Sequence, residues 1–334
     1  MTLRPSPAAT STTALPTTLA PLHVEYAHID PAHALAQTDV LAAIGFGVAD
    51  GDHDDPRWLR VALKPDGAAP LEIWRVEGRA ECGRNGELRW ASDGNYSFVA
   101  LELDEAAHGG IAAAARQAYA QLSDWRSRCA TPHFLRLWNY LDAINGGDGD
   151  AERYRQFCTG RAAGMDTAFT LAYPAATAIG VRDGRRVLQV YALAARAPGT
   201  PVENPRQLNA WCYPRQYGPA APGFARGMRA PALAPQLHIS GTAAIVGHAS
   251  HHAGDLTAQL DETLANLHSL LDAAGSDTPL GNGSLLKVYV RHAEDVAAVR
   301  ELLHSRLHTA AIVLLHADIC RRELLLEIDG LHRG

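Results

Sequence analysis

Long apolar runs are missing from this 334-residue chain, and no segment approaches the roughly 18–20 apolar residues that a membrane-spanning helix needs. The five cysteines are odd in number and form no CxxC pair, which is typical of reduced thiols in the cytoplasm. Neither GxGxxG nor GxxxxGK[ST] occurs, so the common nucleotide-binding fingerprints are absent. A formal net charge of -6 argues against general binding to nucleic acid or membrane surfaces. We therefore expect a cytoplasmic protein with no nucleic-acid or membrane partner.

The expected secondary structure divides the chain into two similar halves. Residues 1–20 are rich in Ser, Thr, Pro and Ala and are interrupted by prolines, which predicts a disordered tail rather than a secretory signal. Alternating and helical periodicities then predict the order β-α-β-α-β-β within residues 21–200 and again within residues 237–334. This repeat predicts an α+β fold of two related domains, each a mixed sheet with two helices on one face.

The two halves are joined by a segment of unusual composition. Residues 196–236 hold eight of the 19 prolines and show no sustained periodicity, which predicts an extended path. Four arginines and no acid lie between Arg206 and Arg229, and Trp211, Tyr213 and Tyr217 are interleaved with them. Loops of this length are usually functional or disordered, and this aromatic content disfavours disorder. We expect residues 201–236 to be an ordered connection that contributes to an active site.

A single carboxylate lies in the apolar strand predicted near the end of the chain. Residues 324–328, Leu-Leu-Leu-Glu-Ile, alternate with the period of a strand, so Glu327 shares a face with Leu325. A carboxylate on a buried face is costly unless it is paired or protonated, and either state shifts its pKa. From the residues alone, a catalytic acid and a salt-bridged strand carboxylate are equally open.

The last hundred residues resemble the RidA/YjgF family. The resemblance rests on Ile239-Ser240-Gly241, Gly254-Asp255-Leu256-Thr257, Lys287-Val288-Tyr289-Val290 and Leu326-Glu327-Ile328. RidA-like domains form trimers or trimer-like assemblies with a cleft between neighbouring sheets, so the resemblance implies a monomer or a trimer built in this way. Where imine-deaminating members carry a carboxylate-binding Arg, this chain has Thr309-Ala310-Ala311, which argues against that activity.

The connection and the strand after it resemble the chorismatase family. The motifs that carry this resemblance are Asn204-Pro205-Arg206-Gln207, Tyr213-Pro214-Arg215-Gln216-Tyr217-Gly218-Pro219, Phe224-Ala225-Arg226-Gly227 and Ile239-Ser240-Gly241-Thr242-Ala243-Ala244. These enzymes join two RidA/YjgF-like (chorismate-mutase-like) domains and release the enolpyruvyl group of chorismate as pyruvate. The resemblance covers residues 134–330 well and the preceding part loosely. It implies chorismate as the small-molecule partner and no cofactor.

The chorismatase resemblance assigns substrate-binding roles to individual residues. It implies that Arg161, Arg215 and Arg226 hold the two carboxylates of chorismate and that Tyr213 hydrogen bonds to a carboxylate or to the ring hydroxyl. On the residues alone, helix-dipole compensation, loop salt bridges and aromatic packing remain alternatives for these four. The same motifs place three further residues in the substrate site: Gly241, Thr242 and Ala243.

Glu327 and Cys320 carry the expected chemistry. Glu327 matches the family's acid, which protonates the enolpyruvyl methylene carbon. Members with Cys at the position of Cys320 resemble the hydroxybenzoate-forming type, whereas the plain hydrolases carry a smaller residue; a buried small hydrophobe is the alternative for this Cys. The resemblance implies 3-hydroxybenzoate and pyruvate, with or without some 4-hydroxybenzoate. Hydrolysis to a dihydroxycyclohexadiene carboxylate and a non-catalytic RidA-like binder stay open.

Three histidines within five residues, His248, His251 and His252, are the remaining candidate site. Such a cluster could hold zinc, but no cysteine or acid at ligand spacing completes it beyond Asp255. We therefore expect no metal.

Overall fold

The computed structural model describes residues 18–47 and 53–334. The tail expected over residues 1–20 lies outside the described residues as far as residue 17. Leu19 is buried, donates its backbone N–H to Pro231 and accepts from Leu233, so the chain is fixed from this point. No helix in the described part of the chain is long and apolar enough to cross a membrane.

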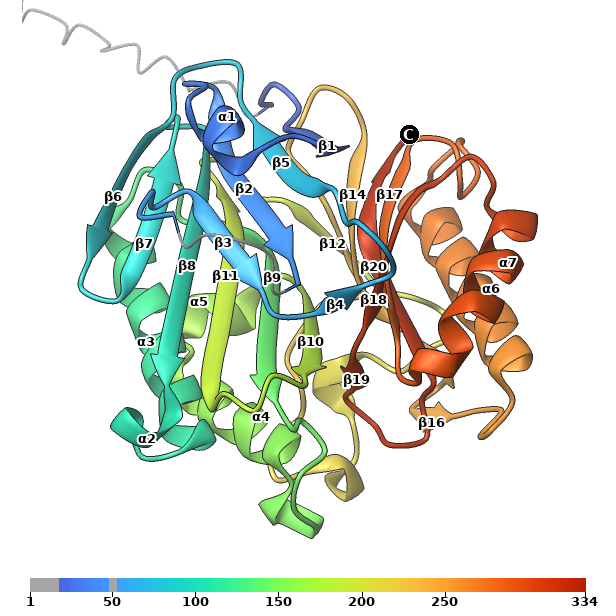
Figure 1. Cartoon of the computed structure of the whole chain (residues 1–334). Coiled ribbons are helices and arrows are strands. Elements are labelled where there is room, and N and C mark those ends of the chain that lie inside the picture. Colours follow the sequence, from blue (N-terminus) through green and yellow to red (C-terminus); the bar gives the residue numbers. More distant parts are fainter. Residues whose placement is uncertain (1–17, 48–52) are drawn as a thin grey trace, which may run out of the picture.

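The N-terminal domain is a seven-stranded sheet covered by helices on one face (Figure 1). Its strands, in the order in which they pair, are β19 (Asp318–Ile319), β10 (Ala175–Val181), β9 (His133–Asp142), β11 (Val187–Ala195), β8 (Tyr96–Asp104), β7 (Leu88–Ser92) and β6 (Glu81–Asn85). Its helices are α2 (Glu105–His108), α3 (Ile111–Arg128), η1 (Gly149–Ala151), α4 (Arg153–Gly164) and α5 (Thr167–Leu171). The apolar side of α3 packs on the sheet through Ala115, Ala118 and Leu122.

The C-terminal domain is a second seven-stranded sheet, and its helices α6 and α7 cover the outer face (Figure 1). Its strands, in pairing order, are β12 (Thr200–Val202), β13 (Gly227–Arg229), β14 (Gln236–Thr242), β20 (Leu326–Arg333), β17 (Ser284–Val290), β18 (Ala311–His316) and β4 (Lys64–Pro65). Its helices are α6 (Leu256–Ala274), η4 (Ala293–Asp295) and α7 (Val296–Arg306). The side chain of Asp255 caps the start of α6, and Gly275 ends it in a left-handed conformation.

Both domains repeat one topology. The strand order β10-β9-β11-β8 corresponds to β18-β17-β20-β14, and in each set the first pair is parallel and the others are antiparallel. The predicted α+β fold of two related RidA/YjgF-like domains is thus confirmed. The apolar residues 237–247 predict one strand, but β14 ends at Thr242. The chain then forms a small hairpin of β15 (Ile245–Val246) and β16 (Ala249–Ser250).

The first part of the chain forms a third sheet that the sequence did not reveal. Its strands are β1 (His23–Ala27), β5 (Leu71–Arg75), β2 (Val40–Phe46) and β3 (Trp58–Val61), and its short helix is α1 (Pro31–Leu35). The order β3-β2-β5-β1, with β2 and β3 parallel, is the same topology again, without long helices. Within residues 21–200 the chain therefore contains two sheets rather than one.

The three sheets bury their inner faces against one another. A shared core joins Trp74 of the small sheet, Trp138 and Tyr191 of the N-terminal sheet, and Tyr289 of the C-terminal sheet. Short strands link the sheets at their edges, because β4 pairs with β18 and β19 pairs with β10. One chain thus holds three sheets of the same topology around a shared core.

Candidate active site

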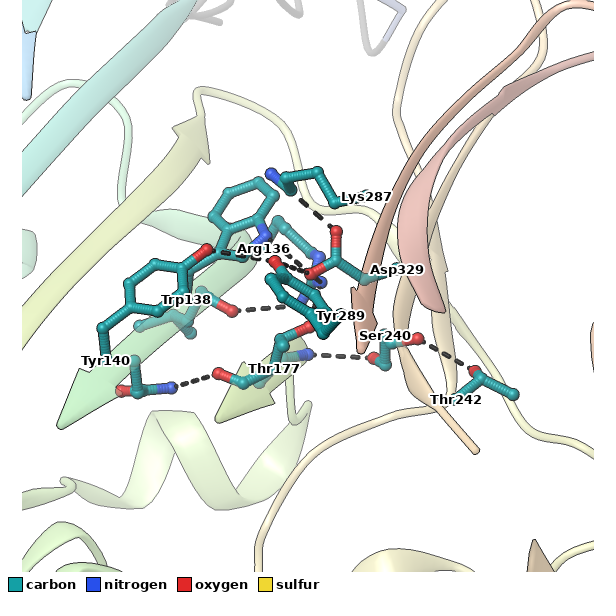
Figure 2. Close-up of polar contacts among 12 residues, drawn as sticks. Arg136, Trp138, Tyr140, Thr177, Ser240, Thr242, Lys287, Tyr289 and Asp329 are labelled. Carbon is teal, nitrogen blue, oxygen red and sulfur yellow. Dashed lines mark hydrogen bonds and ion pairs between the residues drawn. The ribbon is translucent and has the colours of Figure 1, made fainter. Parts of the chain in front are cut away.

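A cavity of about 590 Å³ lies between the N-terminal and C-terminal domains. Strand β10 and helix α4 form one wall, β14 and β20 the second, and the connection over residues 207–226 the third. Next to the cavity the Ala176 N–H of β10 donates to the Ser240 hydroxyl of β14, which fixes the two domains together (Figure 2). The residues of the expected site that line the cavity are Arg161, Tyr213, Arg226, Gly241, Ala243, Cys320 and Glu327.

Two residues expected to bind substrate, Arg215 and Thr242, do not line this cavity. Arg215 points outward with 64% of its side chain exposed and forms a two-pronged ion pair with Asp150 at 2.9 and 2.5 Å. Thr242 is buried and donates its hydroxyl to the Ser240 carbonyl at 2.9 Å. Strand alternation directs the side chain of Thr242 away from the face on which Gly241 and Ala243 border the cavity.

Glu327 on β20 has the environment of a proton donor. The residue is 5% exposed, and its carboxyl group forms no hydrogen bond or ion pair with the described residues. Burial, followed by the negative charge of Asp329, raises its pKa from the ordinary value of 4.5 to about 8, although Arg136 and Arg226 oppose the shift. This shift favours the protonated form of Glu327 at pH 7.

Gly241 makes room for this acid. A Cβ atom at position 241 would lie only 1.9 Å from Oε1 of Glu327. Any side chain there would displace the carboxyl group from its place in the cavity. The structure thus gives Gly241 a steric role beside its position in the motif.

A buried polar cluster surrounds Asp329 (Figure 2). Asp329 lies two residues after Glu327 on β20 and therefore on the same face of the strand. Asp329 is fully buried and accepts hydrogen bonds from the Tyr289 hydroxyl at 2.9 Å and from the Trp138 indole at 3.1 Å. Arg136 lies 3.2 Å and Lys287 3.8 Å from its carboxylate oxygens. These two cations compensate a charge that would otherwise be too costly to bury.

Two buried guanidinium groups face the cavity, and neither forms a direct ion pair with an acid among the described residues. Arg161 on α4 is 4% exposed and Arg226 is 3% exposed. Nε and Nη2 of Arg161 and Nε of Arg226 have no hydrogen-bond acceptor, while Nη2 of Arg226 donates to the Tyr213 hydroxyl at 2.8 Å. Because buried cations are costly unless paired, this arrangement suits a ligand with negative charge.

Close helix packing brings Arg161 to the cavity. A Cβ atom at Gly160 would lie 1.9 Å from the Ala112 carbonyl of α3, so only glycine lets α4 approach α3 this closely. The guanidinium carbon of Arg161 then lies 5.0 Å from the ring centroid of Tyr119 on α3, a cation–π distance.

Cys320 is partly buried between β19 and β20 and lines the cavity. Burial, and then the neighbouring Glu327, raise the pKa of its thiol far above the ordinary value. The thiol is therefore neutral, and its contribution is its size and apolar surface rather than a thiolate.

Several lining residues were missed by sequence reasoning. They are Asn139, Thr177, Tyr217, Phe224 and Arg321. Arg321 directly follows Cys320, and this adjacency was the signal that could have identified it. Thr177 lies on a strand whose sequence is plain Ala-Ala-Thr-Ala, which carries no such signal.

The histidine cluster does not converge on a common point. Nδ1 of His248 lies 3.1 Å from the Tyr217 hydroxyl, and Nε2 of His252 lies 3.1 Å from a Glu262 carboxylate oxygen. In the described part of the chain, no group of three or more His, Cys, Asp or Glu side chains is placed to hold a metal ion.

Comparisons with known proteins agree on one family. The family described as chorismatase FkbO/Hyg5-like, N-terminal, matches residues 72–194. A 3-hydroxybenzoate synthase from Streptomyces hygroscopicus is 36% identical over 297 residues, covering 84% of this chain and 86% of the relative. A chorismatase from Streptomyces rapamycinicus is 37% identical over 277 residues, covering 78% of this chain and 81% of the relative. A chorismatase crystal structure aligns with a TM-score of 0.82 and 32% identity, covering 94% of this chain and 98% of that structure. The chain therefore belongs to the chorismatase family.

Proposed function

We propose that this protein converts chorismate to 3-hydroxybenzoate and pyruvate. The observation that carries the proposal is the meeting, in one cavity, of a buried carboxyl group with a raised pKa and two buried arginines that form no direct ion pair with the described residues. Chorismate is a dianion with one carboxylate on the ring and one on the enolpyruvyl ether. Its two negative charges and its acid-labile enol ether match these two features.

Arg161 and Arg226 are suited to hold the two carboxylates. They approach the cavity from different elements, α4 and the connection, so each can donate to a different carboxylate of one substrate. The Tyr213 hydroxyl accepts from Arg226 and keeps its own proton for a substrate oxygen. Gly241 and Ala243 also line the cavity, and we propose that their backbone and small side chains contact the substrate next to Glu327.

The chemistry begins with proton transfer from Glu327 to the terminal methylene carbon of the enolpyruvyl group, which leaves an oxocarbenium ion. The ring hydroxyl oxygen then attacks the neighbouring ring carbon while the ether C–O bond breaks and pyruvate leaves. The hydroxyl gives up its proton, and one proton returns to the Glu327 carboxylate. The strained three-membered ring isomerises to the phenol. No oxidation or reduction occurs, so the reaction needs no redox cofactor.

Cys320 is assigned a steering role. Its neutral thiol fills a part of the cavity where a smaller residue would leave room for water. Water that adds to the oxocarbenium carbon would give the dihydroxycyclohexadiene carboxylate and pyruvate instead. Partial release of 4-hydroxybenzoate is a further product that the same cavity allows.

All walls of the cavity come from one chain, so we infer that a single copy is sufficient for activity. A trimer of this chain is not needed to complete the site. The expected cytoplasmic location, based on the scattered cysteines, remains a prediction.

Product analysis tests the proposal. Purified protein is incubated with chorismate, pyruvate is measured by a coupled assay, and aromatic products are separated by chromatography. Equal amounts of pyruvate and 3-hydroxybenzoate are expected, and in ¹⁸O-water the phenol oxygen should stay unlabelled. Pyruvate with a non-aromatic diol would show hydrolysis instead, and the absence of pyruvate would leave a non-catalytic binder.

A further inference from the structure

Arg321 is anchored beside the reacting groups but forms no direct ion pair with an acid among the described residues. It lies in the loop between β19 and β20, one residue after Cys320, and lines the cavity. Its Nη1 donates to the His248 carbonyl at 2.9 Å and to the Ser250 hydroxyl at 3.1 Å. The Ser250 hydroxyl in turn donates to a Glu323 carboxylate oxygen at 2.7 Å, so this acid is connected to Arg321 through one hydroxyl group and not by a direct ion pair.

The guanidinium of Arg321 packs against two tyrosines of the connection. Its central carbon lies 4.0 Å from the ring centroid of Tyr217 and 5.3 Å from that of Tyr213, both within cation–π range. The two rings are themselves 5.4 Å apart. Arg321, Tyr213 and Tyr217 thus form one continuous piece of the cavity wall, here called the tyrosine wall.

The tyrosine wall is fixed at each end. The Tyr217 hydroxyl lies 3.1 Å from Nδ1 of His248, the residue whose carbonyl also binds Arg321. At the other end, the Arg226 guanidinium donates to the Tyr213 hydroxyl at 2.8 Å and lies 5.5 Å from its ring centroid. Tyr213 is therefore held between two guanidinium groups.

The backbone of Arg321 is fixed to the C-terminal domain by a second arginine. Arg291 is buried and donates to the carbonyls of Arg321 at 2.7 Å, Ile319 at 2.9 Å and Leu324 at 2.6 Å. The loop that carries Cys320 and Arg321 is thus held by several hydrogen bonds, whereas Tyr213 and Tyr217 belong to the proline-rich segment between β12 and β13, which contains only short 3-10 helices. Arg321 therefore connects this loop to the tyrosine wall, because its backbone is fixed by Arg291 and its guanidinium packs on Tyr213 and Tyr217.

We propose that Arg321 is a positioning residue that closes the tyrosine wall over the oxocarbenium ion and so excludes water from it. This inference rests on the proposed function, in which the ion is consumed either by the ring hydroxyl or by water. With Arg321 in place, the ring hydroxyl reacts and 3-hydroxybenzoate forms. Without it, the wall loosens, water adds to the oxocarbenium carbon, and the intermediate collapses to pyruvate and the diol.

The ratio of diol to 3-hydroxybenzoate at a measured yield of pyruvate tests this role. Pyruvate reports proton transfer from Glu327, and the ratio reports what happens afterwards. We expect Arg321→Met to raise the diol fraction at least fivefold. The total amount of pyruvate formed should fall by a smaller factor. Arg321→Lys, which keeps a cation over the rings, should restore part of the wild-type ratio. An unchanged ratio in Arg321→Met, with only a slower rate, would refute the proposal.

Variants at Tyr217 give an independent measurement if Arg321→Met does not fold. Tyr217→Leu removes the aromatic surface that Arg321 packs on and should raise the diol fraction, whereas Tyr217→Phe keeps the ring and should raise it less. Equal ratios in these two variants would also contradict the proposal. Arg300→Met is the matched control, because this arginine pairs with Asp66 on the surface away from the cavity. Wild-type protein that forms no pyruvate, or only the diol, would instead refute the proposed function itself.

Discussion

Replacing Glu327 with glutamine should abolish turnover and at the same time stabilise the fold at alkaline pH. The amide has nearly the shape of the carboxyl group but cannot ionise or donate a proton to carbon. In the wild-type protein, burial and Asp329 raise the pKa of Glu327 from 4.5 to about 8. The unfolded chain releases this proton near the ordinary value, so between these two pKa values the folded state binds more protons than the unfolded state. Stability contributed by Glu327 therefore falls as the pH rises through this window.

The size of the effect follows from the shift. At about 1.4 kcal/mol per pKa unit, full ionisation of Glu327 in the folded state opposes folding by about 5 kcal/mol. About 2 kcal/mol of this is already present at pH ~6, and the linkage relation gives a further loss of about 2.5 kcal/mol between pH ~6 and ~9. Glu327→Gln lacks this term, so its free energy of unfolding relative to wild type should rise by about that amount over the same interval.

Urea unfolding of both proteins at several pH values measures the difference, and the pyruvate assay measures turnover. Glu301→Gln is a suitable control, because Glu301 is an exposed glutamate on α7. A difference between wild type and Glu327→Gln that does not change with pH would show that Glu327 is not a buried group with a raised pKa. Retained turnover in Glu327→Gln would remove it from the mechanism.

Three further predictions concern the same cavity. Turnover should decline as the pH rises through about 8, where Glu327 loses its proton. In Asp329→Asn the pH–rate profile should show this decline at lower pH, because the negative charge that raises the pKa of Glu327 is gone. Gly241→Ala should lower kcat at least about a hundredfold in steady-state assays, since the new methyl group occupies the place of the carboxyl oxygen; wild-type kcat would contradict this steric role. Arg161→Met should lower kcat/KM by roughly 30-fold, the equivalent of about 2 kcal/mol for a charged hydrogen-bonded contact, whereas Arg215→Met should leave it within about twofold. Equal losses in these two variants would contradict the separation of their roles.

The parts of the fold that the sequence predicted are those with strong local periodicity. Apolar residues recur at steps of three and four from Ile111 to Trp125 and from Leu256 to Leu271. This periodicity predicts helices where α3 and α6 lie. The alternation around Glu327 likewise predicted a buried carboxylate on a strand. The aromatic and arginine content of the connection predicted that it would be ordered, because side chains of this kind need surfaces to pack against.

The parts that were missed depend on contacts distant in sequence. The small sheet is built from short strands with few turns of helix between them, so its likeness to the two larger domains lies in pairing order and not in any local pattern. Strands β4 and β19 have two residues each and are defined only by their partners in another sheet. The direction of a loop side chain is equally non-local: Arg215 pairs with Asp150 on the outside, whereas Arg321 forms no direct ion pair with the described residues and packs on the tyrosines. The position of Thr242 could have been predicted from the sequence. Side chains alternate along a strand, so Thr242 cannot share a face with Gly241 and Ala243.

Proton delivery from Glu327 to the enolpyruvyl methylene is the central claim, and the reaction in D₂O tests it most directly. Chorismate is turned over in D₂O, and pyruvate is reduced at once to lactate so that its methyl group cannot exchange with solvent. Because an acid such as Glu327 takes its proton from solvent, the account predicts one deuterium in each methyl group. A methyl group without deuterium would mean that the hydrogen came from the substrate ring itself, and it would contradict the role of Glu327 as the acid.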